Sequence, residues 1–301
     1  MRILIYAGLA VTATIFLAAW IRAMRSTRPE GGQRFQWPSP LQSVIGFVTN
    51  FFDTLGIGSF APTTSWFKLQ RVVPDERIPG TLNVGHTPPV IAQAFVFIAI
   101  IRVDLITLTS MIAASVIGAW YGAGVVAALP RRSIQIGMGV ALLMAAVTFG
   151  AANLGYAPVG GAAVGLRGGA LAVAVMTSLV LGALMTVGIG MYAPSMIVVS
   201  ALGMNPVVAF PIMMGSCAFL MPAAAVRFLR ADAYSLRPAL GLAVGGIPAV
   251  FIAAFIVRSL PLTTLRWLVV FVVTYAAVTM LSSAYRERAQ AAATALPSTR
   301  A

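Results

Sequence analysis

Two ionisable residues, Asp53 and His86, each lie within a long apolar stretch of the sequence. An ionisable side chain inside the hydrocarbon of a membrane is unfavourable, so such residues are usually retained for a function. A carboxylate and an imidazole can each take up and release a proton. We therefore predict that Asp53 and His86 serve proton or ion coupling. Two structural alternatives stay open: Asp53 could cap a half-helix or pair with an arginine, and His86 could form a hydrogen bond close to the membrane surface.

A short motif that occurs twice is the second candidate for chemistry. Residues 54–62 read TLGIGSFAP and residues 186–194 read TVGIGMYAP, so six of nine positions are identical at an offset of 132. Both copies lie in apolar stretches, where glycine and proline weaken a helix. The matched pair predicts helix breaks at Gly56–Pro62 and Gly188–Pro194. The alternative is that glycine and proline act there only as packing residues, as they often do in membrane helices.

The two predicted breaks are surrounded by hydrogen-bond donors that suit an anion. A half-helix begins after each break, and its free N–H groups and positive dipole end attract negative charge. Hydroxyl and amide side chains nearby add donors, although each of them alone is more often an interhelical hydrogen bond. We predict a substrate site lined by Gly56, Gly58, Ser59, Thr63, Thr64, Asn83, Gly188, Gly190, Tyr192 and Ser195, with Gln93, Asn205 and Ser216 as further polar candidates.

The composition shows which elements must position these residues. Of 301 residues, 59% are hydrophobic and 9% are charged, whereas about 25% of an average soluble domain is charged. About 20 apolar residues cross a bilayer as a helix, and several runs of that length are present. Strands of a membrane barrel would alternate in polarity, and these runs do not. The sequence therefore predicts an all-α, polytopic membrane protein.

The apolar segments form an N-terminal segment followed by two sets of four. Beyond the repeated motif, Pro74 aligns with Pro206 at the same offset, and the tetrapeptide AAVT at 145–148 recurs at 276–279. These matches predict two homologous four-segment repeats. The chain thus divides into 1–40 (an N-terminal transmembrane helix and a basic cytoplasmic loop), 41–151 (the first repeat), 152–167 (a glycine-rich linker), 168–285 (the second repeat) and 286–301 (a polar C-terminal tail).

The distribution of positive charge favours one topology. The 20 Lys and Arg residues divide 12 to 8 between the two sides if every segment crosses the membrane. They divide 15 to 5 if the two motif segments are re-entrant and enter from opposite sides. The second arrangement follows the positive-inside rule better and makes the repeats inverted. We also expect Arg102 and Asp104 to form a pair in a loop.

Several classes of function lack their usual residues in this sequence. A single cysteine, Cys217, permits no disulfide within the chain, and a single histidine permits no His-cluster metal site. We therefore expect no metal and no cofactor. A formal net charge of +13 is explained by basic loops between apolar runs, so we expect no nucleic-acid partner. The sequence has no phosphate-binding GxxxxGK[ST] motif, which disfavours ATP-driven transport by this chain alone.

At the two motif copies the chain resembles the TauE/SafE sulfite-exporter family of permeases. The residues that carry the resemblance are Gly46–Phe47, Phe52–Gly58, Pro62, the Leu129–Pro130 junction, and Gly188–Gly190 with Pro194. The resemblance covers about 41–285. It implies transport of small anions such as sulfite, sulfoacetate, thiosulfate or related organic acids. The charged first-half loop and the additional N-terminal helix depart from the family pattern.

The sequence as a whole thus predicts a secondary transporter of a small anion. The anion would bind between inverted repeats and move by alternating access across a bacterial inner membrane, with the lipid bilayer and a coupling proton or ion as its other partners. Two rivals stay open: a membrane-embedded enzyme that acts on a lipid, and a non-transporting scaffold subunit. We do not expect an enzyme, because the residues offer no convergent set of acids, bases or metal ligands.

Overall fold

The computed structural model describes residues 2–26, 37–127, 131–156, 161–185 and 191–295. Within these ranges the chain is helical, and the only strand-like pairing is an isolated bridge between Ala163 and Met204. The predicted all-α class is confirmed. In chain order the elements are α1 Arg2–Ser26, α2 Pro40–Thr54, α3 Phe60–Leu69, η1 Asp75–Arg77, α4 Ile78–Ile100, α5 Leu105–Ala127, α6 Arg131–Asn153, α7 Gly168–Met185, α8 Tyr192–Ala201, η2 Pro206–Val208, α9 Ala209–Arg230, α10 Leu236–Ser259 and α11 Leu262–Ala295.

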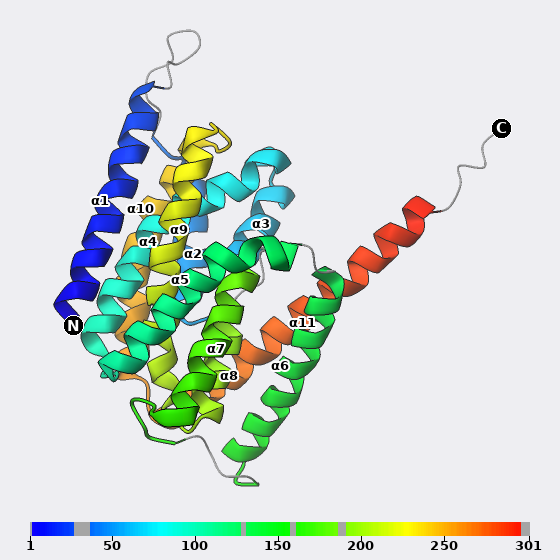
Figure 1. Cartoon of the computed structure of the whole chain (residues 1–301). Coiled ribbons are helices and arrows are strands. Elements are labelled where there is room, and N and C mark those ends of the chain that lie inside the picture. The colour runs from blue at the N-terminus through cyan, green and yellow to red at the C-terminus, as the bar shows by residue number, and fades with distance from the viewer. Residues whose placement is uncertain (1, 27–36, 128–130, 157–160, 186–190, 296–301) are drawn as a thin grey trace.

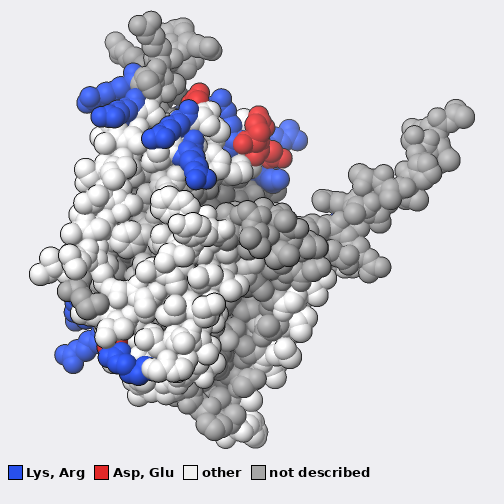
Figure 2. Space-filling model, viewed as in Figure 1, with Lys and Arg blue, Asp and Glu red and all other residues white. Residues whose placement is uncertain are grey.

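Six of the described helices are long and apolar enough to cross a membrane. They are α1, α4, α7, α9, α10 and the part of α11 from Trp267 to Arg286. Figure 2 shows the charged side chains gathered at two opposite ends of the visible face, with an uncharged band between them. A band of this kind is what the hydrocarbon layer requires of the protein surface. The protein is therefore a multi-pass membrane protein.

The helix α2 begins and ends at clear local signals. At its start, Ser39 and Gln42 form a reciprocal capping box, and Pro40 occupies the first turn. At its end, Gly56 has a φ of +96°, its N–H donates to Asp53 O, and the N–H of Ile57 donates to Phe52 O. This pattern is a Schellman motif, which favours glycine at the left-handed position. The helix is thus interrupted at Gly56, and α3 begins at Phe60 with Pro62 in its first turn.

The segment α2–α3 enters and leaves at one end of the molecule, which we call the α9–α10 end because the turn 231–235 lies there. Before α2, Trp37 O accepts a hydrogen bond of 2.9 Å from Arg237 Nε at the start of α10. After α3, Arg77 Nη1 donates to Tyr234 O at 3.2 Å. The segment therefore forms a hairpin that does not cross to the other end (Figure 1).

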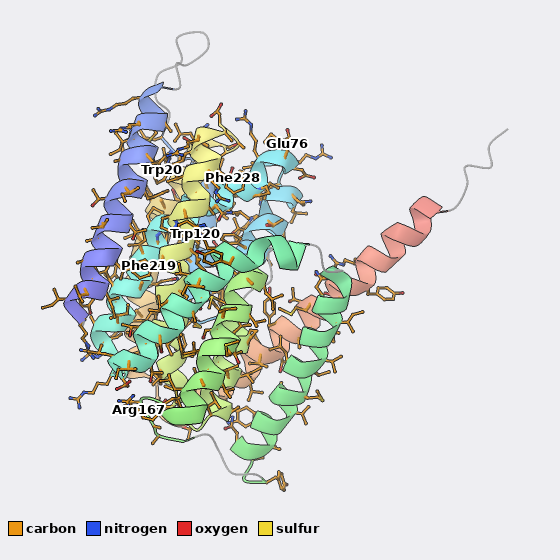
Figure 3. All side chains as sticks on the ribbon, viewed as in Figure 1. Trp20, Glu76, Trp120, Arg167, Phe219 and Phe228 are labelled. Atoms are coloured by element: carbon orange, nitrogen blue, oxygen red, sulfur yellow. The ribbon has the colours of Figure 1, made fainter. Side chains whose placement is uncertain are left out.

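The segment α7–α8 enters and leaves at the opposite end, which we call the α4–α5 end after the turn 101–104. Before α7, Leu166 N donates to Thr107 Oγ1 at 2.9 Å. After α8, Asn205 N donates to Ala163 O at 2.8 Å. Figure 3 shows the separation of the two ends, with Arg167 at the α4–α5 end and Glu76 of η1 at the other. The two hairpins therefore enter the protein from opposite ends.

The helices of the two halves contact each other in a reciprocal pattern. The element order α3, η1, α4, α5, α6 recurs as α8, η2, α9, α10, α11. The most extensive contacts pair α2 with α10, α5 with α7, α4 with α9, and α6 with α11. Exchanging the corresponding elements of the two halves leaves this set of pairs unchanged, as an approximate twofold axis requires. The origin of the halves by duplication stays a prediction.

Glycines allow the reciprocal helix pairs to pack closely. A Cβ added at Gly245 of α10 would meet the Ser43 carbonyl oxygen of α2. A Cβ added at Gly182 of α7 would likewise meet the Ser115 carbonyl oxygen of α5. Small residues at such positions let two membrane helices approach backbone to backbone. Each hairpin is thus held against the α5 or α10 helix of the other half.

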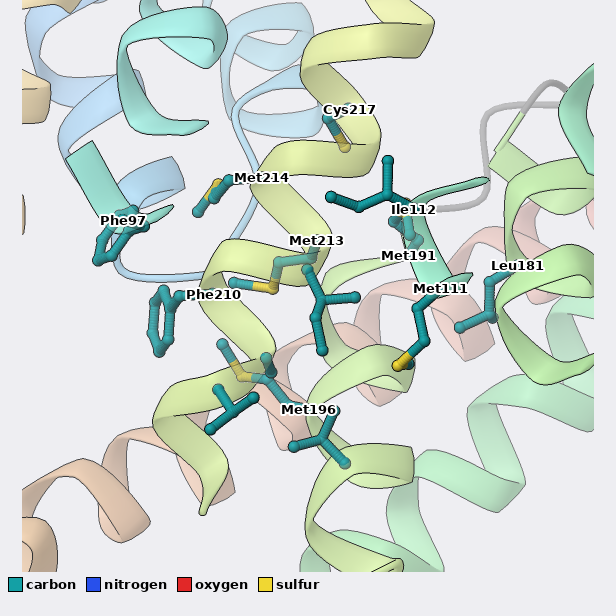
Figure 4. Close-up of a cluster of buried hydrophobic side chains, with 14 of the residues drawn as sticks. Phe97, Met111, Ile112, Leu181, Met191, Met196, Phe210, Met213, Met214 and Cys217 are labelled. Carbon is teal, nitrogen blue, oxygen red and sulfur yellow. The ribbon is translucent and has the colours of Figure 1, made fainter. Parts of the chain in front are cut away.

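The protein core lies between the hairpins and is rich in methionine. Met196, Met213 and Met214 are fully buried within one large apolar cluster that also contains Phe97 and Phe210, whose rings stack (Figure 4). A Cβ added at Gly56 would collide with the methyl group of Met196. The interruption of α2 is therefore packed against the second half. The helices α6 and α11 contact mainly each other and contribute buried residues such as Leu142 and Val272 to this core. The helix α11 continues through residues 286–295, the start of the predicted tail.

Candidate functional site

A buried group of polar side chains surrounds the interruption between α2 and α3. It consists of two linked parts. The Asp53 cluster comprises Asp53, Thr54, Ser59, Gln93 and Tyr192, and the His86 cluster comprises Asn50, Thr63 and His86.

Asp53 stands at the end of α2, about 20 Å along the helix from Pro40. This depth is well inside a hydrocarbon layer of about 30 Å, and the side chain is 2% exposed. Its Oδ2 accepts a hydrogen bond of 2.8 Å from Gln93 Nε2 of α4. The left-handed turn at Gly56 brings the chain back, so that Ser59 lies beside the carboxyl and interacts with it. Asp53 thus lies between the end of α2 and the start of α3.

No salt bridge to Asp53 is found among the described residues. The alternative in which Asp53 pairs with an arginine therefore has no support there. The carboxyl is instead surrounded by neutral donors, which can hold either its ionised or its protonated form. The second half reaches the carboxyl through the hydroxyl of Tyr192, whose oxygen lies 3.5 Å from Asp53 Oδ2. Because Tyr192 begins α8, the carboxyl lies where the two hairpins meet.

Gln93 joins Asp53 to the neighbouring threonine. Its Nε2 donates both to Asp53 Oδ2 and, at 2.9 Å, to Thr54 Oγ1. The Thr54 hydroxyl in turn donates to Asn50 O at 2.7 Å. The other end of the amide differs: Gln93 Oε1 is buried and has no hydrogen-bond partner in the described part of the chain. A buried polar atom without a partner is uncommon and calls for an explanation.

His86 is fully buried and bonded at both ring nitrogens. Its Nδ1 is 3.0 Å from Asn50 Oδ1 and its Nε2 is 3.1 Å from Thr63 Oγ1. The amide orientation of Asn50 is fixed, because its Nδ2 donates to Gly46 O at 2.7 Å. Oδ1 is therefore an acceptor, and His86 Nδ1 carries a hydrogen. The structure places His86 in the interior beside the interruption, hydrogen-bonded as the structural alternative expected, and its role in coupling stays a prediction.

The hydrogen of the Thr63 hydroxyl has two possible acceptors. Thr63 Oγ1 is 2.7 Å from Ser59 O and 3.1 Å from His86 Nε2. A neutral His86 leaves Nε2 as an acceptor, so Nε2 and Ser59 O compete for one hydrogen. A protonated His86 donates from Nε2 to the hydroxyl, which then donates to Ser59 O. The protonation state of His86 is thus linked to a hydrogen bond at the start of α3.

The second half contributes fewer polar groups to this region. At an offset of 132, Asp53 corresponds to Met185 and His86 corresponds to Ala218, so the ionisable pair belongs to the first half alone. The thiol of Cys217 lies 3.8 Å from Met185 Sδ and interacts with Tyr192. Ser195 is buried in the first turn of α8. The site therefore has a polar side on the first half and a largely apolar side on the second.

Not every residue predicted for the site lies in these clusters. Asn83 lies on α4 near the α9–α10 end, where it is partly exposed and donates to Pro79 O at 2.9 Å. Thr64 is half-buried beside Thr63. Gly58 has a φ of +91° and forms the turn with Gly56. Gly188 and Gly190 lie outside the described residues.

Asn50 and Thr54 are site residues that the sequence reasoning missed. They share the buried face of α2 with Asp53, at the spacing of one helical turn. A polar stripe of Asn50, Asp53 and Thr54 on an otherwise apolar segment is a signal that could have identified them. Gln93 was considered only as a further polar candidate, and the structure places it at the centre of the Asp53 cluster.

A salt bridge outside the site holds the second hairpin at the α4–α5 end. Arg167 binds Asp104 through two contacts, Nη1 to Oδ1 at 2.7 Å and Nη2 to Oδ2 at 2.8 Å. The Arg167 guanidinium holds the pKa of the Asp104 carboxyl well below its usual range. Asp104 thus pairs with the residue before α7, and the pair expected between Arg102 and Asp104 is not the one that the structure contains.

No family model, curated protein or solved structure matches the chain. The resemblance to the TauE/SafE permeases therefore rests on the quoted residues alone.

Proposed function

We propose that the protein is a secondary transporter of a small anion, which binds between the two hairpins and moves by alternating access. One observation carries the proposal: Asp53 and Ser59 of the first hairpin face Tyr192 of the second inside the protein. Interrupted helices that meet near the membrane midplane form the substrate sites of many secondary transporters. Irregular backbone at this depth persists where it is buried in protein or lines a cavity. The hairpins entering from opposite ends supply the two-sided construction that alternating access needs.

The donors of the site support an anion as substrate. The Gln93 amide donates to the Asp53 carboxylate, the Tyr192 hydroxyl lies 3.5 Å from it, and Ser59 lies beside it. The same neutral donors can bind a free carboxylate, sulfonate or sulfite, without burying a lysine or arginine. The resemblance to the TauE/SafE permeases favours a sulfur-containing oxyanion or a related organic acid within this class.

The charges at the two ends support an orientation in the membrane. Figure 2 shows more Lys and Arg at the α9–α10 end of the visible face than at the other end. The basic residues of the described chain at that end include Arg22, Arg25, Lys68, Arg71, Arg77, Arg227, Arg230 and Arg237. By the positive-inside rule this end faces the cytoplasm. We place the protein in a bacterial inner membrane with the first hairpin opening to the cytoplasm.

Counterflow in proteoliposomes tests the transport proposal. Vesicles with purified protein are loaded with unlabelled sulfite, thiosulfate or sulfoacetate, and entry of the labelled anion is followed. We expect at least one of these anions to accumulate transiently, and Ser59→Ala to reduce the uptake. The matched control is Ser110→Ala, which removes a half-buried hydroxyl on α5, away from the site, and should leave uptake unchanged.

Two outcomes would contradict the proposal. A folded, reconstituted protein that exchanges none of the anions in the panel would favour a scaffold subunit. Turnover of a membrane lipid by the purified protein, lost in Asp53→Asn, would favour an enzyme.

A further inference from the structure

The donors around Asp53 come from three separate elements. Ser59 precedes α3, Gln93 belongs to α4, and Tyr192 begins α8. Such a set, gathered around one carboxylate inside the protein, is what a bound small oxyanion requires. In the structure these donors serve the protein's own carboxylate. A second anion would find the donors already occupied and would be repelled by the like charge of Asp53. It therefore cannot enter while Asp53 remains ionised in this position.

Gln93 can serve Asp53 in two protonation states. In the present orientation Nε2 donates to Asp53 Oδ2 and to Thr54 Oγ1, which suits an ionised carboxylate. Rotating the amide by half a turn places Oε1 there instead, where it accepts from a protonated carboxyl, and the Thr54 hydroxyl keeps its bond to Asn50 O. Nε2 and its two hydrogens then lie where Oε1 lies now. At that position Oε1 has no hydrogen-bond partner in the described part of the chain. The orphaned oxygen thus marks a place where Gln93 can present donors.

Among the described residues, Asp53 is the one carboxylic acid in the buried interior. Tyr192 of α8 and Cys217 of α9 face it and are neutral at ordinary pH. On α4, His86 is engaged with the hydrogen bonds described above. The remaining charges of the packed helices lie away from it: Lys68 ends α3, and Arg237 and Arg258 lie at the two ends of α10.

We propose that Asp53 is a tethered anion that occupies the donor set of the substrate, and that the transported oxyanion binds there in exchange when Asp53 takes up a proton. The proposal rests on the anion-transport function above and deepens it. On protonation the carboxyl keeps one hydrogen bond to Gln93, and the donors of Ser59 and Tyr192 become free for the incoming oxyanion. One proton is taken up per anion bound, so that a monovalent anion crosses with its proton as a neutral pair and a divalent anion crosses with one net negative charge.

The exchange predicts a defined pH dependence of anion binding. The pKa values of the acid groups of thiosulfate and sulfoacetate lie about two units or more below pH 6. Both anions therefore keep a constant charge between pH 6 and pH 8. Binding to the detergent-purified full chain can be measured by titration calorimetry. For the wild type we expect the dissociation constant to rise about tenfold per pH unit wherever the free protein has Asp53 ionised. We expect Asp53→Asn to bind with no pH dependence, because its amide carries no charge to remove.

Two further measurements keep the proposal open to refutation if Asp53→Asn does not fold. Calorimetry of the wild type in two buffers with different ionisation enthalpies should show uptake of about one proton per anion. The matched variant Asp104→Asn removes a carboxylate outside the site and should keep the wild-type slope, which ties the proton uptake to Asp53. Binding without proton uptake, or a folded Asp53→Asn that no longer binds, would overturn the exchange and leave anion transport standing. A folded protein that binds neither anion at any pH in either form would refute both proposals.

Discussion

Replacing Asn50 by alanine tests the network that holds His86 inside the protein. Asn50 Oδ1 lies 3.0 Å from His86 Nδ1, and both side chains are fully buried. Because the Asn50 amide is fixed by its bond to Gly46 O, the imidazole donates in this contact. The substitution leaves a buried N–H without an acceptor, which costs about 1–3 kcal/mol. We expect the free energy of unfolding to fall by that amount.

Asn83 offers a matched control on the neighbouring helix. Its Nδ2 donates to the carbonyl four residues earlier, as Asn50 Nδ2 does, but the side chain is partly exposed. Asn83→Ala therefore removes a similar local bond without orphaning a buried group. We expect it to change the free energy of unfolding by less than about 0.5 kcal/mol.

Unfolding can be followed in mixed micelles of increasing SDS content. Cys217 is the single cysteine and is buried, so a fluorogenic thiol reagent reacts with it only after the protein opens. Adding His86→Phe completes a double-mutant cycle. In that background no imidazole N–H remains to be orphaned, and Asn50→Ala should destabilise less. Equal losses for Asn50→Ala and Asn83→Ala, or an additive cycle, would refute the assigned role of the contact.

Three other predictions concern helix packing, the second ring nitrogen and the surface salt bridge. Gly245→Ala should destabilise by about 1–3 kcal/mol, because its Cβ meets a backbone carbonyl of α2, whereas Gly137→Ala on α6 should be neutral or stabilising. Thr63→Val should destabilise by about 1–3 kcal/mol, whereas Thr177→Val on the exposed face of α7 should have little effect. Asp104→Asn should lower the melting temperature at pH 7, and its difference from the wild type should shrink as the pH falls below about 4.

The sign of the third prediction follows from the depressed pKa of Asp104. The pair stabilises the fold at every pH above the ordinary carboxyl pKa, and this contribution is lost as the pH falls toward the lower pKa of the folded state. A difference that grows on acidification would contradict it. For the other two, an equal response of each variant and its control, measured by the SDS titration, would show that the contacts around Gly245 and Thr63 are not those described.

Local signals explain why the interruption of α2 could be predicted. A left-handed φ at Gly56 is a property of one residue, and proline fits the first turn of a helix wherever it occurs, so the motif alone placed the break. Burial of Asp53 and His86 likewise followed from the apolar stretches around them. These features need no knowledge of which helices touch.

Contacts between distant segments explain what the sequence could not supply. The partner of Asp104 is Arg167, which is 63 residues away, rather than the nearby Arg102. Asn50 and Gln93 acquire their roles only because α2 and α4 lie side by side in the fold. The packing of α2 on α10 and of α7 on α5 exchanges helices between the halves, and no local pattern specifies that exchange.

The most direct test of the central claim is whether a small anion binds at the donor set between the hairpins. Melting of the detergent-purified protein is followed by its intrinsic tryptophan fluorescence against a panel of sulfonates, sulfite, thiosulfate and carboxylates. A ligand that binds only the folded protein raises the melting temperature with its concentration. We predict such a rise for one anion class, lost in Ser59→Ala and kept in Ser110→Ala. A well-folded protein whose melting temperature responds to no anion, or equally in both variants, would contradict the account.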